Sequence, residues 1–151
     1  MKNLSVTVTD KHFAVNKLQI HKLVNFIKNY LSLKVDYLEI NLVSSSEILE
    51  INTEHLNHNY TTDIITFNYS EIMDVIDAEI FISLHDCLNN SKRFKCSFND
   101  ELKRLIIHGM LHLIGFDDKT KKEQLKMRKK ENELLEIINV NSNLRLSEYA
   151  G

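Results

Sequence analysis

The chain has 151 residues, 43% of them hydrophobic and 26% charged, and its formal net charge is −2 with the histidines neutral. This length suits one domain with a substantial core, and the near balance of charge excludes a protein whose whole surface binds nucleic acid. No segment approaches the run of about 18 apolar residues that a membrane span needs. The alternating N-terminus, MKNLSVTVTD, lacks the layout of a secretion signal. Cys87 and Cys96 do not form a C-x-x-C pair. We therefore expect residues 1–151 to form a single soluble, cytoplasmic domain that does not bind membranes.

The hydrophobic pattern predicts the order strand, helix, strand, helix, two strands and then helices to the end. Strict alternation indicates a strand and a period near 3.6 indicates a helix. Strands are predicted at 4–9, 35–43, 63–69 and 78–83, and helices at 16–31, 46–56, 84–94, 98–114 and 120–139. Ser97 and Thr120 each stand three residues before an acid, as in a capping box, and Gly115 is placed to end a helix. The pattern predicts an α+β domain with a mixed sheet covered by helices.

The segment HGMLHLIGFDD, residues 108–118, predicts a metal site at the end of a central helix. His108 and His112 are four residues apart, so on a helix their imidazoles share one face. Because Gly115 stops the helix, the chain can return an acid to the same point; Asp118 is the predicted third ligand and Asp117 the alternative. Asp117 could equally accept a ring N–H from a ligand histidine or cap a helix. The competing interpretation is two partly buried histidines beside acids that cap a helix end.

Two imidazoles and a carboxylate, without thiolate, suit zinc, although manganese or nickel could also bind. Three protein ligands leave a coordination position for water, as catalytic zinc sites do. Zinc lowers the pKa of that water to roughly 7, so hydrolysis is the predicted reaction class. Gly109 stands where H-E-x-x-H metalloproteases carry their general base. This residue counts against peptide hydrolysis and favours a phosphodiester, whose developing charge neighbouring cations can stabilise.

The same segment resembles the H-G-x-L-H-L-x-G-Y-D-H signature of the YbeY endoribonucleases, with Phe116 in place of tyrosine. LNHNYTTDIITF (56–67) is similar to the family's L-N followed by P-T-D-V-L-S-F, AEIFIS (78–83) to its G-D-I-x-I-S strand, and ELKRLIIHG (101–109) to its first ligand helix. The resemblance implies a zinc-dependent, single-strand-specific endoribonuclease with one zinc ion per chain. It implies action on ribosomal RNA, chiefly near the 3′ end of the small-subunit RNA, and in ribosome quality control. A small-subunit ribosomal protein is implied as a partner.

The resemblance also shows two departures. The family's three metal histidines fall on His108, His112 and Asp118, and the carboxylate at the third position lowers the charge of the site by one. Carboxylate is a competent zinc ligand, but it should make the zinc a weaker electrophile. The family arginine between the L-N and T-D pairs is missing, since the chain runs directly from Asn57 to the T-D pair, and the family proline falls on Thr61.

A substitute for the missing cation must come from elsewhere in the chain. Arg104 lies one helical turn before the first metal histidine and is the predicted catalytic cation. Arg93 and Lys92, from the preceding helix, are the alternatives. For Arg104 the competing interpretation is an exposed helix salt bridge to Asp100 or Glu101.

Other polar residues have two interpretations each. Three further histidines could either line the cleft or lie on the polar surface: His55, His58 and His85. Thr62 and Asp63, similar to the family's T-D pair, orient the site or pair a strand end.

A basic segment follows the metal motif. It carries one acid, Glu123, among Lys119, Lys121, Lys122, Lys126, Arg128, Lys129 and Lys130. Such a run on a helix is either a solvated face or a contact with an RNA backbone. Two alternative functions are also compatible with the sequence: a metalloprotease-type hydrolase, and a catalytically inactive ribosome-associated binding module with a structural metal.

Overall fold

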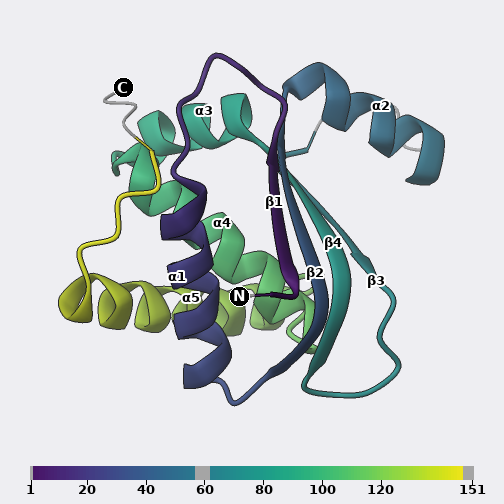
Figure 1. Ribbon diagram of the computed structural model, residues 1–151, viewed down its shortest axis with the longest axis vertical. Helices are drawn as coiled ribbons and strands as arrows, with labels where there is room; N and C mark the ends of the chain where they lie inside the picture. Colours follow the sequence, from purple (N-terminus) through teal and green to yellow (C-terminus); the bar gives the residue numbers. More distant parts are fainter. Residues whose placement is uncertain (1, 57–61, 148–151) are drawn as a thin grey trace.

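The computed structural model describes residues 2–56 and 62–147, and within them the elements follow the predicted order (Figure 1). The strands are β1 (Leu4–Val8), β2 (Lys34–Val43), β3 (Ile64–Asn68) and β4 (Val75–Ser83). The helices are α1 (Lys17–Tyr30), α2 (Ser45–Leu56), α3 (Leu84–Phe94), α4 (Phe98–Leu113) and α5 (Lys121–Asn141). The prediction of an α+β domain with a mixed, helix-covered sheet is confirmed.

The sheet has the strand order β1-β2-β4-β3. β1, β2 and β4 are parallel, whereas β3 pairs antiparallel with β4 at the edge. β4 begins three residues earlier than the hydrophobic pattern predicts, because Val75 pairs with Lys34 of β2 before the apolar run starts. At the other end of β4 the Ser83 N–H donates to the Asp63 carbonyl at 3.0 Å. The T-D segment therefore lies where α3 begins.

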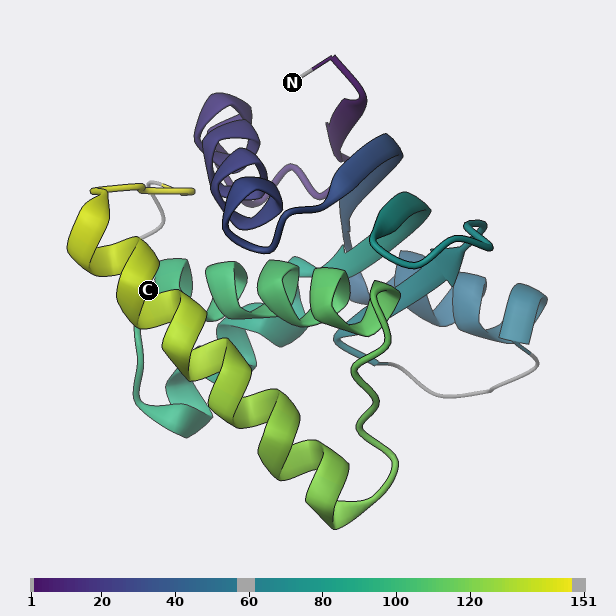
Figure 2. The same cartoon turned by 90° about the horizontal axis from the view of Figure 1, so that it is seen from below.

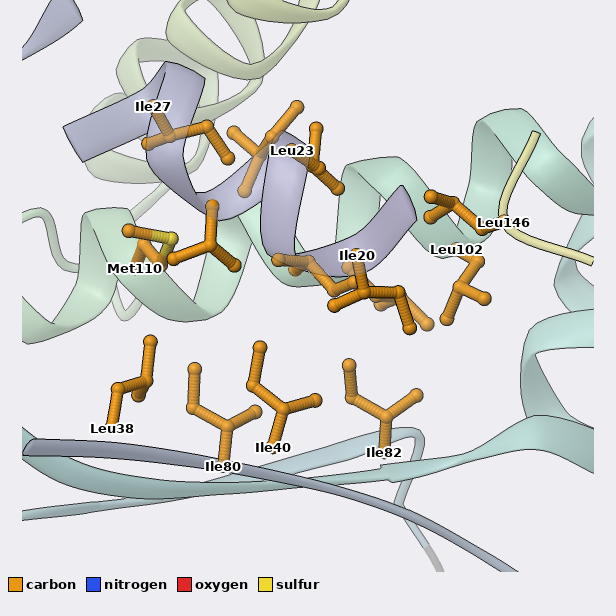
Figure 3. Close-up of a cluster of buried hydrophobic side chains, with 14 of the residues drawn as sticks. Ile20, Leu23, Ile27, Leu38, Ile40, Ile80, Ile82, Leu102, Met110 and Leu146 are labelled. Atoms are coloured by element: carbon orange, nitrogen blue, oxygen red, sulfur yellow. The ribbon is translucent and has the colours of Figure 1, made fainter. Parts of the chain in front are cut away.

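The main core lies between the sheet and the helices α1 and α4 (Figure 3). Ile40 and Ile80 of the sheet face Leu23 of α1 and Met110 of α4, and all four are fully buried. On the opposite face, α2 packs against one end of the sheet, where its Ile48 contacts Val43, Ile65 and partly buried Phe67. The burial of apolar side chains in the main core holds α4, the helix with the paired histidines, against the sheet.

Gly109 allows α4 to approach the sheet closely. A Cβ atom at this position would lie 3.0 Å from Ile80 Cδ1 and 3.1 Å from Ile64 Cδ1. These distances are tighter than ordinary van der Waals contact, so only glycine fits without movement of its neighbours. Position 109 thus faces the sheet.

The predicted helix ends agree with the structure. Gly115 has φ of +108°, and its N–H donates to the His112 carbonyl at 3.2 Å, so the glycine ends α4. The Ser97 hydroxyl accepts from the Asp100 N–H at 3.0 Å, and Thr120 and Glu123 form a complete capping box at the start of α5. The turn between these helices brings α5 back across α4 (Figure 2).

The two cysteines form no disulfide. Cys87 and Cys96 are both free thiols, and burial raises the pKa of each. Within residues 2–56 and 62–147, no helix is long and apolar enough to cross a membrane.

Candidate functional site

The predicted metal ligands line one small cavity. His108 and His112 of α4 share it with Asp118 from the turn after Gly115, and the cavity has a volume of about 190 Å³. The remaining wall consists of Thr62, Ile64 and Thr66 from β3 and the segment before it. His108 Nε2 lies 3.5 Å from Asp118 Oδ2, and the Asp118 side chain is 46% exposed. The helical spacing and the glycine stop thus place all three residues on the lining of one cavity.

Both histidines have one ring nitrogen engaged by an oxygen acceptor. His108 Nδ1 lies 2.7 Å from Glu131 Oε2, and His112 Nδ1 lies 3.1 Å from the Phe116 carbonyl oxygen. A carboxylate and a carbonyl can only accept, so both Nδ1 atoms carry the hydrogen. In the neutral rings the Nε2 atoms therefore keep their lone pairs. This is the arrangement that metal-ligating histidines commonly adopt.

The electrostatics of His108 follow from its partners. Burial lowers its pKa, but the hydrogen bond that the ring donates to Glu131 and the attraction of the Glu131, Asp118 and Asp63 carboxylates outweigh burial and raise the pKa overall. A metal that binds His108 must displace its proton, so metal affinity should rise with pH as the ring loses that proton.

The donor set fits a borderline metal such as zinc. Among the described residues, no group of three or more His, Cys, Asp or Glu side chains is placed so that it could hold a metal ion. His108 and His112 nevertheless have lone pairs on Nε2, and Asp118 adds a partly exposed carboxylate to the same cavity. Two imidazoles and a carboxylate form a recognised catalytic zinc donor set.

Glu131, which the sequence analysis missed, is the residue that orients His108. Its side chain belongs to α5 and the residue is only 4% exposed. Besides His108, it contacts Arg104, whose Nη1 lies 3.6 Å from Glu131 Oε1. The sequence does carry a signal: Glu131 is a lone acid on the buried stripe of α5 that includes Met127, Leu134 and Ile138. An acid at such a position needs a partner.

A chain of polar contacts extends from Glu131 to the start of β3. Arg104 Nε lies 3.8 Å from Glu101 Oε1, and Glu101 Oε2 accepts from Asn90 Nδ2 at 3.4 Å. Asn90 also donates to Asp63 Oδ2 at 2.9 Å. Burial raises the pKa of Glu101, although Arg104 and Asn90 act in the opposite direction. Asp63 therefore links the strand end to the helices around the site.

The interpretation of Arg104 as an exposed helix salt bridge is wrong in one respect. Its side chain is only 19% exposed, and its guanidinium contacts buried Glu101 and Glu131. Its Nη1 also donates to Asn132 Oδ1 at 2.6 Å. Asp100, the other expected partner, lies 4.0 Å from Lys103 Nζ instead. Arg104 is a partly buried link between α4 and α5 on the side of the candidate ligands.

A second, larger cavity adjoins the first. Its volume is about 460 Å³, and it shares Ile64, His108 and Asp118 with the smaller one. Among the cations proposed to replace the family arginine, Arg104 and Arg93 line it, whereas Lys92 is not one of its described lining residues. The basic segment contributes Lys121 and Arg128. Part of that segment thus faces the site.

Both secondary roles considered for Asp117 are wrong. The histidine ring nitrogens have Glu131 and Phe116 as acceptors, and the N-cap of α5 is Thr120. Asp117 lines a separate cavity of about 200 Å³ beside Phe116. Asp118 is therefore the better candidate for the third ligand.

Among the remaining candidate residues, some line the two cavities and others lie on the exposed surface. Thr62 lines the ligand cavity, and Asp63 both lines the larger cavity and pairs the strand end. His55 is exposed with its ring edge-on to Phe67, and His85 is exposed on α3. His58 falls outside the described residues, as do Asn57, the second residue of the L-N pair, and Thr61, at the family's proline position.

The fold and the site together define a class of small α+β domain with two helix-borne histidines and a returning acid beside a cavity. Residues 4–139 match the family model described as endoribonuclease YbeY, and the chain belongs to this family.

Two relatives named endoribonuclease YbeY show the extent of the similarity. The Flavobacterium psychrophilum protein is 43% identical over 107 residues, which cover 70% of this chain and 76% of the relative. The Azobacteroides pseudotrichonymphae protein is 48% identical over 95 residues, covering 63% and 68%. The solution structure of TM1509 from Thermotoga maritima is similar over 91% of this chain and 93% of that one, with a TM-score of 0.60 and 25% identity. The family predicted from the motifs is confirmed.

Proposed function

We propose that this chain is a zinc-dependent endoribonuclease that cuts single-stranded RNA, in maturation of the 3′ end of small-subunit ribosomal RNA and in ribosome quality control. The observation that carries the proposal is that the cavity of His108, His112 and Asp118 shares lining residues with a larger cavity that exposed cations also line. Family membership supports the reaction class. A ribosomal protein of the small subunit remains the partner we propose.

His108 and His112 would hold the zinc through Nε2, and Asp118 would hold it through its carboxylate. When bound, zinc acts as a Lewis acid and lowers the pKa of a water molecule to roughly 7. Glu131 and the Phe116 carbonyl fix the two imidazole rings by accepting their Nδ1 hydrogens. The rings are therefore oriented before any metal arrives.

Cations at the larger cavity would bind the RNA phosphates. Arg93, Lys121 and Arg128 are exposed and line that cavity. Arg104 is held by Glu101, Glu131 and Asn132, so we assign it mainly to the positioning of Glu131. The exposed cations are better placed than Arg104 to take over the task of the missing family arginine.

Peptide hydrolysis is the weaker alternative. In an H-E-x-x-H protease the general base follows the first histidine. Here that position is Gly109, which faces Ile80 and Ile64 of the sheet. A phosphodiester, which cations can stabilise directly, suits the site better.

The test is a cleavage assay with the purified full chain on single-stranded and duplex RNA, after chelation and again after zinc is restored. Metal content is measured in the same samples. We expect zinc-dependent cutting of the single strand, lost in His112→Ala. His85→Ala, which removes an exposed histidine of α3, serves as the matched control and should retain both metal and cleavage.

Other outcomes separate the alternatives. A chain that holds about one zinc ion yet cuts no RNA would favour the binding module with a structural metal. A chain that binds no zinc would contradict the metal site. Cleavage of casein without cleavage of RNA would favour the protease. For the biological role, we expect cells depleted of the protein to accumulate small-subunit RNA with an extended 3′ end.

A further inference from the structure

Phe94 is an exposed aromatic residue beside two arginines. It is the last residue of α3, and it remains 49% exposed. The guanidinium carbon of Arg93 lies 4.8 Å from the centre of its ring, and that of Arg128, from α5, lies 5.9 Å away. Two separate elements thus place cations over one half-exposed ring. Cation–π contacts of this kind hold guanidinium groups in a defined position.

The ring faces the hollow that contains the candidate metal ligands. Phe94, Arg93 and Arg128 all line the cavity of about 460 Å³, which extends to His108 and Asp118. A volume between about 300 and 1,000 Å³ is typical of sites for small organic ligands. The cavity therefore has room for a nucleotide beside the metal site.

Charge is divided between the inside and the mouth of this cavity. Glu101 and Glu131 are 3% and 4% exposed, and both are paired with Arg104. Arg93 and Arg128, by contrast, are exposed and can reach a ligand from solvent. The accessible part of the cavity combines cations with an aromatic ring. This combination is how proteins bind single-stranded nucleic acids, by pairing with the phosphates and stacking on the bases.

We propose that Phe94, Arg93 and Arg128 form a nucleotide subsite for single-stranded RNA next to the scissile phosphate. An unpaired base stacks on the Phe94 ring or on a guanidinium plane, and a flanking phosphate pairs with Arg128. Every base has a stacking face, so the subsite is tolerant of sequence. A base inside a duplex has both faces covered by its neighbours, so the subsite selects single strands. This inference rests on the proposed nuclease function.

The first measurement is the dissociation constant for a fluorescent single-stranded octanucleotide RNA, with His112→Ala in every protein to prevent cleavage. Adding Phe94→Ala should weaken binding by about 5- to 150-fold, the usual effect of losing one stacked base. Phe94→Tyr should restore binding to within about twofold, since tyrosine also stacks. Tyr30→Ala is the matched control: Tyr30 is exposed and has Lys130 Nζ 6.0 Å from its ring centre, but it lines a different cavity.

The second measurement separates stacking from phosphate pairing through the salt dependence of binding. Arg128→Gln should lower the slope of log affinity against log salt by about 0.7, the value for one phosphate contact on a single strand. Phe94→Ala should leave the slope unchanged. Lys126→Gln is the control, because it removes the same charge from the same helix. Since Lys126 lies over Phe116 and not over Phe94, this variant should change neither the slope nor the affinity appreciably.

The outcomes distinguish the subsite from the nuclease. Wild-type cleavage of RNA together with equal affinities for the Phe94→Ala and Tyr30→Ala proteins would overturn the subsite and leave the nuclease standing. Phe94-dependent binding by a chain that cuts nothing would support the subsite and contradict the nuclease. A chain that neither binds nor cuts single-stranded RNA would contradict both. Equal loss of affinity for duplex RNA in Phe94→Ala would also overturn the stacking role.

Discussion

The two faces of α4 are stabilised in different ways. Toward the sheet and α1, Leu102, Gly109 and Met110 pack against apolar side chains without polar contacts (Figure 3). Toward α3 and α5, Glu101 and Arg104 begin a polar stripe that continues through the two histidines at spacings of three or four residues. The stability of the apolar face depends on how closely its side chains fit together. The second depends on each polar group having its partner, because an unpaired buried charge is costly.

This contrast predicts which substitutions each face tolerates. The apolar face should be sensitive to volume and insensitive to pH. The polar face should tolerate small changes of volume and be sensitive to the loss of a charge or a hydrogen bond. Substitutions at four positions test whether the two faces differ in this way.

Gly109→Val tests the apolar face. The added methyl groups would meet Ile80 and Ile64, since even a Cβ lies 3.0 and 3.1 Å from their Cδ1 atoms. We expect the free energy of unfolding to fall by roughly 1–3 kcal/mol, the usual cost of overpacking. Urea denaturation measures it. Gly109→Ala is the control and should stay within about 1 kcal/mol of the wild type, because alanine favours the helix and the ends of isoleucine side chains can move. An equal loss of unfolding free energy in both variants would argue against overpacking by the added methyl groups as the cause.

Glu131→Gln tests the polar face with almost no change of volume. The amide cannot provide the charge that now holds His108 Nδ1 at 2.7 Å. We expect zinc affinity to fall about 10- to 100-fold, or roughly 1.4–2.8 kcal/mol, as for other residues that orient metal-ligating histidines. Competition with a chromophoric chelator measures the affinity. Glu133→Gln, which removes an exposed charge from the same helix, should leave it unchanged. Equal zinc affinities for the two variants would contradict the role of Glu131 in orienting His108.

Thr120→Ala tests how far the polar face depends on the position of α5. The Thr120 hydroxyl accepts from the Glu123 N–H at 3.1 Å, and the Glu123 carboxylate accepts from the Thr120 N–H at 2.9 Å. We expect the free energy of unfolding to fall by about 1 kcal/mol. Thermal denaturation beside Thr120→Ser, which keeps the cap, checks the value. Zinc affinity should change less than in the Glu131 variant, and a larger loss of affinity would show that the site depends on the helix end.

Glu101→Gln tests whether the polar face responds to pH. Burial raises the pKa of Glu101 in the folded chain despite Arg104 nearby. The folded state therefore holds the proton more tightly than the unfolded state, and ionisation costs stability as pH rises through the folded pKa. We expect the stability of the wild type relative to Glu101→Gln to decrease between about pH 4 and pH 7. Chemical denaturation at both pH values measures the difference. A difference that increases with pH would mean that pairing with Arg104 outweighs burial.

Local sequence patterns predicted most of the fold. Alternation and helical period depend on which side chains share a face, and this information lies within each segment. The ends of α4 and α5 were predicted because caps and glycine stops are formed by residues only a few positions apart. The start of β4 was missed because Val75 is fixed by pairing with Lys34 of β2, a partner far away in the chain.

For the candidate site, local sequence was enough to predict the pair His108 and His112, the stop at Gly115 and the return of Asp118, since one helical turn and one left-handed residue suffice for these. The surroundings of these residues depend on the packing of the whole chain. Glu131 reaches His108 from α5, and Phe94 meets Arg128 across two helices. Such contacts depend on how helices pack, and packing is set by the shared core of all the elements, which no single segment of sequence specifies.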